Sequence, residues 1–283
     1  MEYTPPPGSI TGPVAESQPS LGARLGIAIS RREQLLLGAL GVVLVLGVWW
    51  GIAASGVINP LIFASPVDSA VAFVRLFVSG EIYPHLLASG RLLFAGLAVA
   101  VISGTILGFA AGWFRTLRAV LMPHVSLLYS TPSIALMPLL LVFLGLGFTS
   151  QFAVVVLLAF FPAYYAAVDA VVTTDPNLLR LARSFTASDL KVFRTVILPG
   201  SIPVLISGLR LALGKGIIAV VIVELYASAE GIGFFLNLSG RRFQTDNVFA
   251  IISLLALIGL LASIGFRSLE QRFDNWRPRT AAN

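Results

Sequence analysis

The chain has 283 residues, of which 57% are apolar and only 11% are charged. A soluble domain carries about 25% charged residues, so this composition excludes an ordinary soluble fold and predicts an all-α polytopic membrane protein. The absence of cysteine excludes disulfides and thiolate metal sites.

The first 84 residues contain one clear membrane span. Residues 1–30 are rich in Pro, Gly and Ser, which predicts a disordered cytoplasmic tail. Leu35 to Ala54 then form an apolar run of the ~20 residues that are needed to cross a bilayer. Because this run is too long for a signal-peptide core and starts far from the terminus, it favours a retained span over a cleaved signal. In the remainder of the segment 31–84, residues 66–78 can form an amphipathic helix along the outer membrane surface.

The second span, expected at 85–112, carries small residues at every fourth position. A row of this kind lets another helix backbone approach closely, so the span should lie inside the helix bundle. The row consists of Gly96, Ala100, Gly104, Gly108 and Gly112.

The third span, expected at 120–146, is interrupted by the polar sequence YSTPS. A broken helix at membrane depth persists only where protein or water satisfies the freed backbone groups. We therefore interpret the break as a hinge or a segment that lines the transport pathway, with an ordinary proline kink as the alternative. The candidate pathway residues at this break are Tyr129, Ser130, Thr131 and Ser133.

The remaining apolar segments predict three further spans, which gives about six transmembrane helices. The fourth is expected at 151–172, the fifth ends near Ala227, and the sixth covers 248–266. Residues 228–247, between the last two spans, are interpreted as an outer loop.

The positive charges indicate which side of the membrane each loop faces. With the N-terminus inside, 13 of the 19 Lys and Arg residues fall in inner segments, three in outer segments and three within spans. This asymmetry places the N-terminus and the loop 175–199 in the cytoplasm, and it accounts for the net charge of +6 without nucleic acid. The transmembrane domain accordingly covers 85–270, and residues 271–283 form a second cytoplasmic tail.

The cytoplasmic loop between the fourth and fifth spans has the pattern of two short helices. Asp175 can cap the first helix, and Pro176 suits its first position, where a missing N–H costs nothing. A second helix is expected at about 188–196, with Pro199 and Pro203 delimiting the next element. The apolar face of the first helix has to be covered, either by a partner protein or by the bilayer surface. This face consists of Leu178, Leu179, Ala182 and Phe185.

The sequence LARSFTASDLKVFRTVILPGSIPVLISGLRLALGKG resembles the coupling loop in permease subunits of binding-protein-dependent ABC importers. The family pattern is Glu-Ala-Ala, three residues, Gly, nine residues, then a branched apolar residue, any residue and Leu-Pro. The resemblance covers roughly residues 65–277 and is closest to permeases of the nitrate, sulfonate and taurine type. The residues that match the pattern are Ala182, Val196, Leu198 and Pro199. The residues that depart from it are Arg180 in place of Glu, Leu181 in place of Ala, and Thr186 in place of Gly.

This resemblance implies the fold of a type I ABC importer permease in a bacterial inner membrane, with two permeases expected to form a homodimer. It implies that the loop docks onto a separate ATP-binding subunit, which holds ATP and Mg²⁺, while this chain itself binds no cofactor. A periplasmic or extracellular solute-binding protein would deliver a small anion, such as a sulfonate, taurine, nitrate or bicarbonate. The residues that the resemblance assigns to ATPase coupling are Leu178, Ala182, Arg183, Ser184, Phe185, Thr186, Ala187, Leu198 and Pro199.

Three charged residues of the fifth span, Arg210, Lys215 and Glu224, complete the candidate pathway. A charge at the bilayer centre costs about 2.5–3.5 kcal/mol on insertion scales, so each should face protein or water. Lys215 and Glu224 are nine residues apart and lie on opposite helix faces, so neither can be the partner of the other. Our hypothesis is that Arg210 and Lys215 make the pathway positive for an anion. The alternative is that they neutralise Asp169 or lipid phosphate.

Two other classes of function stay open on sequence grounds. A channel or secondary transporter that works without ATP is disfavoured by the amphipathic cytoplasmic loop and by the absence of a visible inverted repeat. An intramembrane enzyme is disfavoured because the sequence has no recognisable catalytic motif. No phosphate-binding loop occurs in the sequence either, so ATP hydrolysis would need a partner chain.

Overall fold

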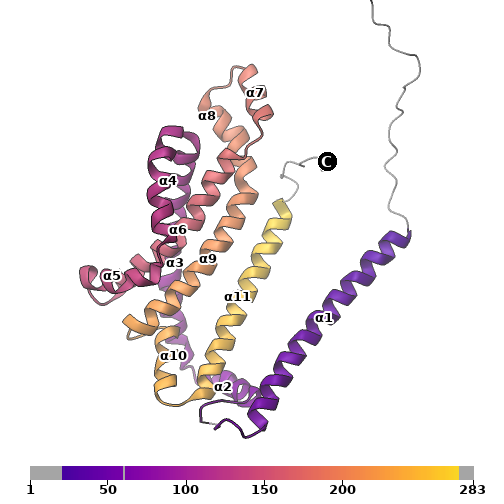
Figure 1. Cartoon of the computed structure of the whole chain (residues 1–283), viewed down its shortest axis with the longest axis vertical. Coiled ribbons are helices and arrows are strands. Elements are labelled where there is room, and N and C mark those ends of the chain that lie inside the picture. The colour runs from indigo at the N-terminus through magenta and orange to yellow at the C-terminus, as the bar shows by residue number, and fades with distance from the viewer. Residues whose placement is uncertain (1–20, 60, 274–283) are drawn as a thin grey trace, which may run out of the picture. The chain divides into compact units, whose positions relative to one another are not determined.

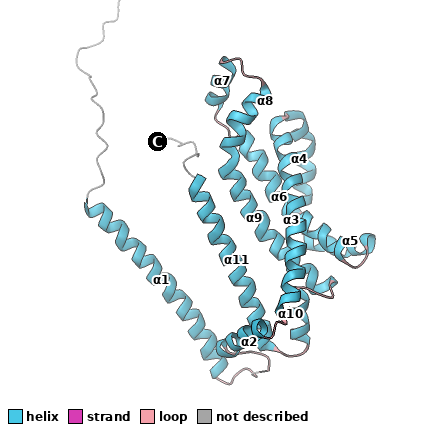
Figure 2. Cartoon of the chain, turned by 180° about the vertical axis from the view of Figure 1, so that it is seen from behind, coloured by secondary structure: helices cyan, strands magenta, loops and turns pink. Residues whose placement is uncertain are grey.

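The computed structural model describes residues 21–59 and 61–273, and within these ranges all regular structure is helical (Figure 1, Figure 2). The chain divides into a unit of residues 1–58 and a unit of residues 59–283, which we describe separately. In the first unit, α1 covers Leu21–Ala54. Its part Leu35–Ala54 is long and apolar enough to span a membrane, as predicted.

The start of α1 corrects the prediction of a disordered tail over residues 1–30. Residues 1–20 lie outside the described part of the chain, but residues 21–30 are helical. The last proline before this helix is Pro19, and the residues that follow it are mainly Ala, Leu, Ile and Arg, which favour helix. The prediction used the average composition of residues 1–30, which conceals the change in composition after Pro19.

The second unit supplies the other candidate spans. Among the described residues, five helices of the chain can span a membrane, and a sixth span results if α4 and the segment 134–144 form one bent span. This confirms the prediction of about six. The helices are α2 (Pro66–Val78), α3 (Ile82–Trp113), α4 (Arg115–Ser130), α5 (Met137–Leu144), α6 (Phe148–Val172), α7 (Pro176–Ser184), α8 (Asp189–Val192), α9 (Leu198–Ala227), α10 (Ile232–Arg241) and α11 (Thr245–Phe273).

The central packing of the second unit places α6 against both α3 and α9. All five small residues of the row on α3, from Gly96 to Gly112, are buried, which confirms the prediction that this span lies inside the bundle. A Cβ atom at Gly104 would lie 2.8 Å from the carbonyl oxygen of Phe160 on α6. Only glycine therefore allows the two backbones to approach this closely.

The third predicted span is broken, as the YSTPS sequence indicated. The segment 134–144, which follows α4, lies at 85° to it. Thr131 is extended (ψ 131°), as expected for a residue that precedes a proline. Pro132 has no N–H with which to continue the helix. The predicted span 120–146 is therefore two helices joined by a 3₁₀ turn at Ser133–Leu136.

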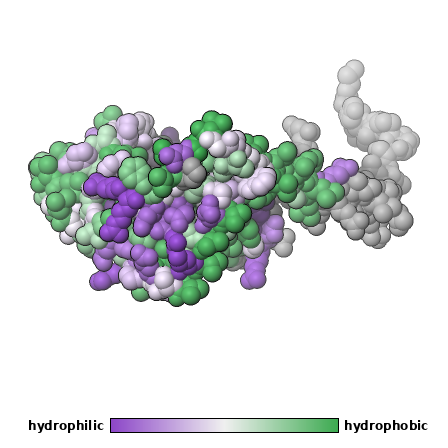
Figure 3. Space-filling model, turned by 90° about the horizontal axis from the view of Figure 1, so that it is seen from below, coloured by the Kyte–Doolittle hydropathy of each residue, from purple (hydrophilic) through white to green (hydrophobic). Residues whose placement is uncertain are grey.

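The segment predicted as an outer loop, 228–247, contains the helix α10, so it is not an irregular connection, while its outer position stays a prediction. Ile232 and Phe235 of this helix are buried in a cluster with residues of α2, α3 and α11. The segment is of mixed polarity, and its apolar residues form one face that distant parts of the chain cover. On the end of the molecule that carries α2 and α10, hydrophilic residues gather near the centre and hydrophobic residues occupy much of the rim (Figure 3).

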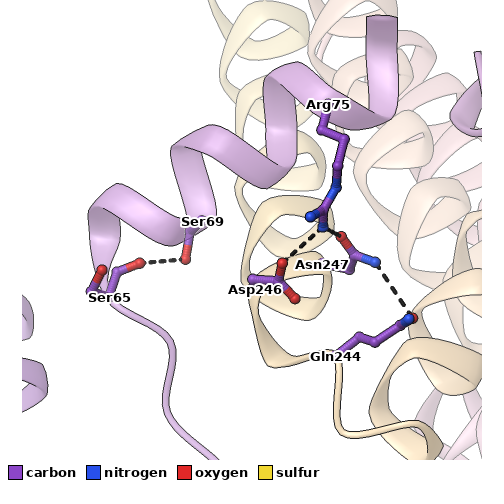
Figure 4. A network of polar contacts seen from close by, with 6 residues as sticks. All are labelled: Ser65, Ser69, Arg75, Gln244, Asp246 and Asn247. Atoms are coloured by element: carbon purple, nitrogen blue, oxygen red, sulfur yellow. Dashed lines mark hydrogen bonds and ion pairs between the residues drawn. The ribbon is translucent and has the colours of Figure 1, made fainter. Parts of the chain in front are cut away.

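An ion pair fixes α2 to the start of α11. Arg75 of α2 donates to Asp246 (2.8 Å) and to Oδ1 of Asn247 (2.8 Å), and Asn247 in turn donates to Gln244 (Figure 4). Ser65 caps α2, because its hydroxyl accepts a hydrogen bond from the N–H of Asp68 in the first turn. Figure 4 shows from close by a second bond at this end, from the hydroxyl of Ser69 to the Ser65 carbonyl (2.8 Å). The helix predicted at 66–78 carries four valines at spacings of three or four residues, and all of them are exposed: Val67, Val71, Val74 and Val78.

The second helix of the predicted cytoplasmic loop is not a separate element. α8 continues through a π-helical segment, Phe193–Ile197, directly into α9. Pro199 lies in the first turn of α9, and Pro203 lies inside it. The two prolines therefore do not delimit an element, because a local π adjustment and the surrounding helices can satisfy the backbone groups that a proline frees.

Candidate coupling surface and transport cavity

Local hydrogen bonds fix both ends of α7. At its start, the carboxylate of Asp175 accepts from a backbone N–H two residues further on (2.8 Å), which confirms the predicted cap. At its end, the N–H of Thr186 donates to the carbonyl of Arg183 (2.9 Å), and the N–H of Ala187 donates to that of Ala182 (3.3 Å). These two bonds form a Schellman motif, which stops the helix and turns the chain toward α8.

The Schellman motif places Thr186 in the left-handed region, with φ at +53°. Glycine, which stands at this position in the family pattern, adopts that conformation without strain. A residue with a Cβ atom is strained there by about 1–2 kcal/mol. The departure from the pattern therefore leaves the turn in place and puts a strained residue in it.

Large apolar side chains are exposed on one face of α7, and a further one is exposed on α8. The exposed fraction is 55% for Leu181 and 46% for Leu178 on α7, 76% for Phe185 at its C-terminal cap, and 60% for Leu190 on α8. Leu179, which was predicted to belong to this face, is half-buried instead. Leu181 was missed, although its spacing of three residues from Leu178 and four from Phe185 would have indicated it.

The remaining residues assigned to coupling lie at the same end of the second unit. Figure 1 places α7 and α8 at the end opposite to α2 and α10. We call residues 176–192, which include α7 and α8, the coupling surface. Of the assigned residues, Arg183, Ser184, Thr186 and Leu198 are exposed, and Ala182, Ala187 and Pro199 are half-buried.

A cavity of about 630 Å³ lies between α4, α6 and α9. It brings together three of the predicted pathway residues, Tyr129, Ser130 and Lys215, which lie far apart in the sequence. The hydroxyl groups of Ser126 and Tyr165, 3.1 Å apart, also lie in its wall and were not predicted. The complete lining is Ser126, Tyr129, Ser130, Pro162, Tyr165, Ala166, Asp169, Val204, Ser207, Gly208, Leu211 and Lys215.

The charges around this cavity are of both signs. Lys215 is exposed and forms no ion pair within the described part of the chain, and Asp169 lines the same cavity. Arg210 does not line it. Its guanidinium lies 3.5 Å from the carboxylate of Glu270 on α11, which also accepts a hydrogen bond from Ser207 (3.0 Å). Of the two basic residues in the hypothesis, only Lys215 therefore contributes its charge to the cavity.

Three further pathway candidates are not among the residues that line this cavity. The hydroxyl of Thr131 donates to the carbonyl of Leu127 (2.9 Å), which satisfies it within α4. The side chain of Ser133 lies outside what the structure describes. Glu224 is 2% exposed and bonded to Ser89, near the α10 end of the unit.

Comparisons with known proteins agree with this arrangement. The family of binding-protein-dependent transport system inner membrane components matches residues 88–275. The taurine transport system permease protein of Escherichia coli (strain K12) is 34% identical over 88% of this chain and 91% of its own length. The aliphatic sulfonates transport permease protein of Bacillus subtilis (strain 168), whose assignment is provisional, is 31% identical over 87% of this chain and 90% of its own length.

A solved structure shows the same fold. A chain of the methionine ABC transporter in an inward-facing conformation superimposes with a TM-score of 0.52 at 19% identity, covering 68% of this chain and 94% of that chain. The identity is low, so this likeness concerns the fold alone. The family match over residues 88–275 and the 34% identity to the taurine permease lead to one conclusion. The chain belongs to the family of binding-protein-dependent transport system inner membrane components, the membrane-spanning permeases of ABC transporters.

Proposed function

We propose that the chain is the permease subunit of an ATP-driven importer for small organic anions of the sulfonate class, with taurine as the first solute to test. The observation that carries this proposal is Lys215, which forms no ion pair with any residue that the structure describes, in a cavity lined by hydroxyl groups. A sulfonate has three acceptor oxygens, which suit an ammonium group and hydroxyl donors. The curated relatives named for taurine and aliphatic sulfonates support this class of solute.

The energy for transport comes from a separate ATPase in this proposal. That subunit holds ATP and Mg²⁺ and docks on the coupling surface, whose exposed Leu178, Leu181 and Phe185 need a cover. An apolar patch rimmed by polar residues is typical of a protein interaction site. Residues 175–199 therefore act as the coupling loop within a transmembrane domain of residues 85–270.

The rest of the assembly follows from the same orientation. The coupling surface, the N-terminus and residues 271–283 lie in the cytoplasm, and the chain sits in a bacterial inner membrane. A solute-binding protein delivers the solute at the α10 end, and two copies of the permease enclose the pathway. Opening on alternate sides is then a rigid-body movement of the helices, driven through the coupling loop.

Uptake in liposomes tests this function. The chain, reconstituted with its cognate ATPase and solute-binding protein, should accumulate radiolabelled taurine only when ATP is supplied on the side of the ATPase. Uptake by the chain alone along a gradient would instead support a channel or secondary transporter. If no ATP-dependent uptake of taurine or of an alkanesulfonate is seen, the proposed solute class is wrong.

Lys215 and Arg210 provide a matched pair of variants for the same assay. Lys215→Gln should raise the taurine concentration for half-maximal uptake about tenfold, because a hydrogen bond to a charged group contributes about 1.5–3 kcal/mol. Arg210→Gln should change it less than about twofold, because Arg210 pairs with Glu270 outside the cavity. Equal effects of the two variants would contradict the role of Lys215.

A further inference from the structure

The first turn of α10 is held by side chains from two other helices. The first N–H groups of a helix have no partner within it, and here α3 and α9 supply the acceptors. The contacts therefore attach the start of α10 to both neighbours at once. The three bonds run from the N–H of Gly231 to Nδ1 of His85 (3.2 Å), from that of Ile232 to Oγ of Ser89 (2.8 Å), and from that of Gly233 to Oε2 of Glu224 (2.9 Å).

Glu224 lies at the centre of this arrangement. It is only 2% exposed, and the hydroxyl of Ser89 donates to both of its carboxylate oxygens, at 2.7 and 2.8 Å. The same hydroxyl accepts from α10, so Ser89 connects the carboxylate to the helix start. A carboxylate beside a helix N-terminus is also favoured by the helix dipole. Without α10, the buried carboxyl group would thus lose the Gly233 N–H and keep only Ser89 as a partner.

The two glycines at the start of α10 leave room for this carboxylate. A Cβ atom at Gly231 would overlap the carboxylate of Glu224, and Gly231 also has a positive φ of +105°. A Cβ atom at Gly233 would lie 2.8 Å from the Cβ of Glu224. Both glycines therefore leave the space that the Glu224 side chain occupies, and Gly233 also donates a hydrogen bond to it.

Contacts further along α10 hold it to the same two helices. The side-chain amide of Asn237 donates to the carbonyl of Leu225 on α9 (2.7 Å). The ring of Phe235 stacks on that of His85 on α3, with centroids 4.7 Å apart. α10 is thus held to α3 and α9 at its first turn by polar groups, and further along by one polar and one aromatic contact.

From these contacts we propose that Glu224 is a positioning residue for transport, which makes α10 move as one body with α3 and α9. Moving α10 alone would leave the N–H groups of residues 231–233 without acceptors and would remove one donor from the buried Glu224, which is costly in a low-dielectric interior. The α10 end of the pathway therefore opens by movement of all three helices and not by α10 swinging as a separate lid. This inference rests on the proposed transport function.

A cross-link between α3 and α10 tests the joint movement with Glu224 intact. The chain has no cysteine, so the double variant His85→Cys, Phe235→Cys carries the only two thiols. The two native rings are stacked, so a short bis-maleimide should join these positions. We expect the cross-linked permease to retain uptake within about twofold of the same variant without cross-linker. Loss of uptake on cross-linking alone would show that α10 moves separately and would overturn the proposal.

The yield of that cross-link tests the role of Glu224 without any transport. In the double-cysteine background, Glu224→Gln should lower the yield several-fold, because the amide cannot accept all the bonds that the carboxylate accepts. The matched control is Glu230→Gln, an exposed carboxylate in the same connection, which should leave the yield unchanged. Equal yields in the two variants would overturn the positioning role. Because this readout needs no solute, a failure of taurine uptake in the unmodified permease would count against the proposed function only.

Discussion

Among single residues, Thr186 shows how a departure from a family pattern is accommodated. Glycine is usual at this position, and the structure has Thr186 in the left-handed conformation that glycine favours. The turn after α7 is therefore determined by its two Schellman hydrogen bonds rather than by the residue at its centre.

Replacing Thr186 with Gly should stabilise the end of α7 by up to about 1 kcal/mol, because the strain of the left-handed conformation exceeds the extra backbone entropy of glycine. Amide hydrogen exchange over residues 176–187, followed by mass spectrometry, should slow by up to about fivefold. The control is Ser188→Gly, since Ser188 has an ordinary φ of −63° and should gain nothing. Faster exchange in Thr186→Gly than in the unmodified chain would contradict this account.

Arg210 and Lys215 show what residue-level reasoning from the sequence could not resolve. The two side chains are five residues apart and therefore point about 140° apart around α9. Which of the two faces a cavity depends on where α4, α6 and α11 lie. The sequence predicted that both charges need partners, and the structure shows that the partner of Arg210 is Glu270.

At the scale of elements, the row of small residues on α3 was the most informative pattern. Its four-residue period predicted close helix packing, and the structure identifies α6 as the partner. The pattern could not identify the partner helix, because a row of small residues allows many different helices to approach closely. α10 shows the opposite case, since its buried face was not recognised in a segment of mixed polarity.

The substitution Gly104→Val should disrupt the contact between α3 and α6, because its Cβ would meet the Phe160 carbonyl oxygen at 2.8 Å. Overpacking of this kind costs about 1–3 kcal/mol. The amount of monodisperse protein in detergent and its thermal unfolding temperature should both fall. Gly90→Val on the same helix is the control, because no atom lies within 4 Å of a Cβ there. Equal losses in the two variants would indicate an effect on helix α3 itself and not on its packing.

For the whole molecule, the charge distribution makes a prediction about orientation. The positive-inside rule places the coupling surface in the cytoplasm and the α10 end outside. This assignment requires the two parts to lie at opposite ends of the second unit, and α7 and α8 do lie at the end opposite to α2 and α10 (Figure 1).

Single cysteines in this cysteine-free chain can test the orientation. In intact cells, a membrane-impermeant maleimide should label Arg241→Cys, at the exposed end of α10, and should not reach Arg180→Cys on α7. In inside-out vesicles, Arg180→Cys should become reactive and should be protected when the ATPase is bound. Labelling of Arg180→Cys from outside intact cells would reverse the orientation and remove the proposed coupling surface from the ATPase.

Sequence alone was enough to predict the membrane class, the approximate spans, the broken third span and the start of α7, because each depends on residues close together in the chain. Hydropathy, a proline without its N–H and a capping carboxylate act within a few residues, so they can be read locally. The folded chain was needed to identify the partners of α3, the burial of α10 around Glu224, and the position of Lys215 rather than Arg210 in the cavity wall. Those features depend on groups from helices far apart in sequence, whose meeting is set by packing of the whole bundle.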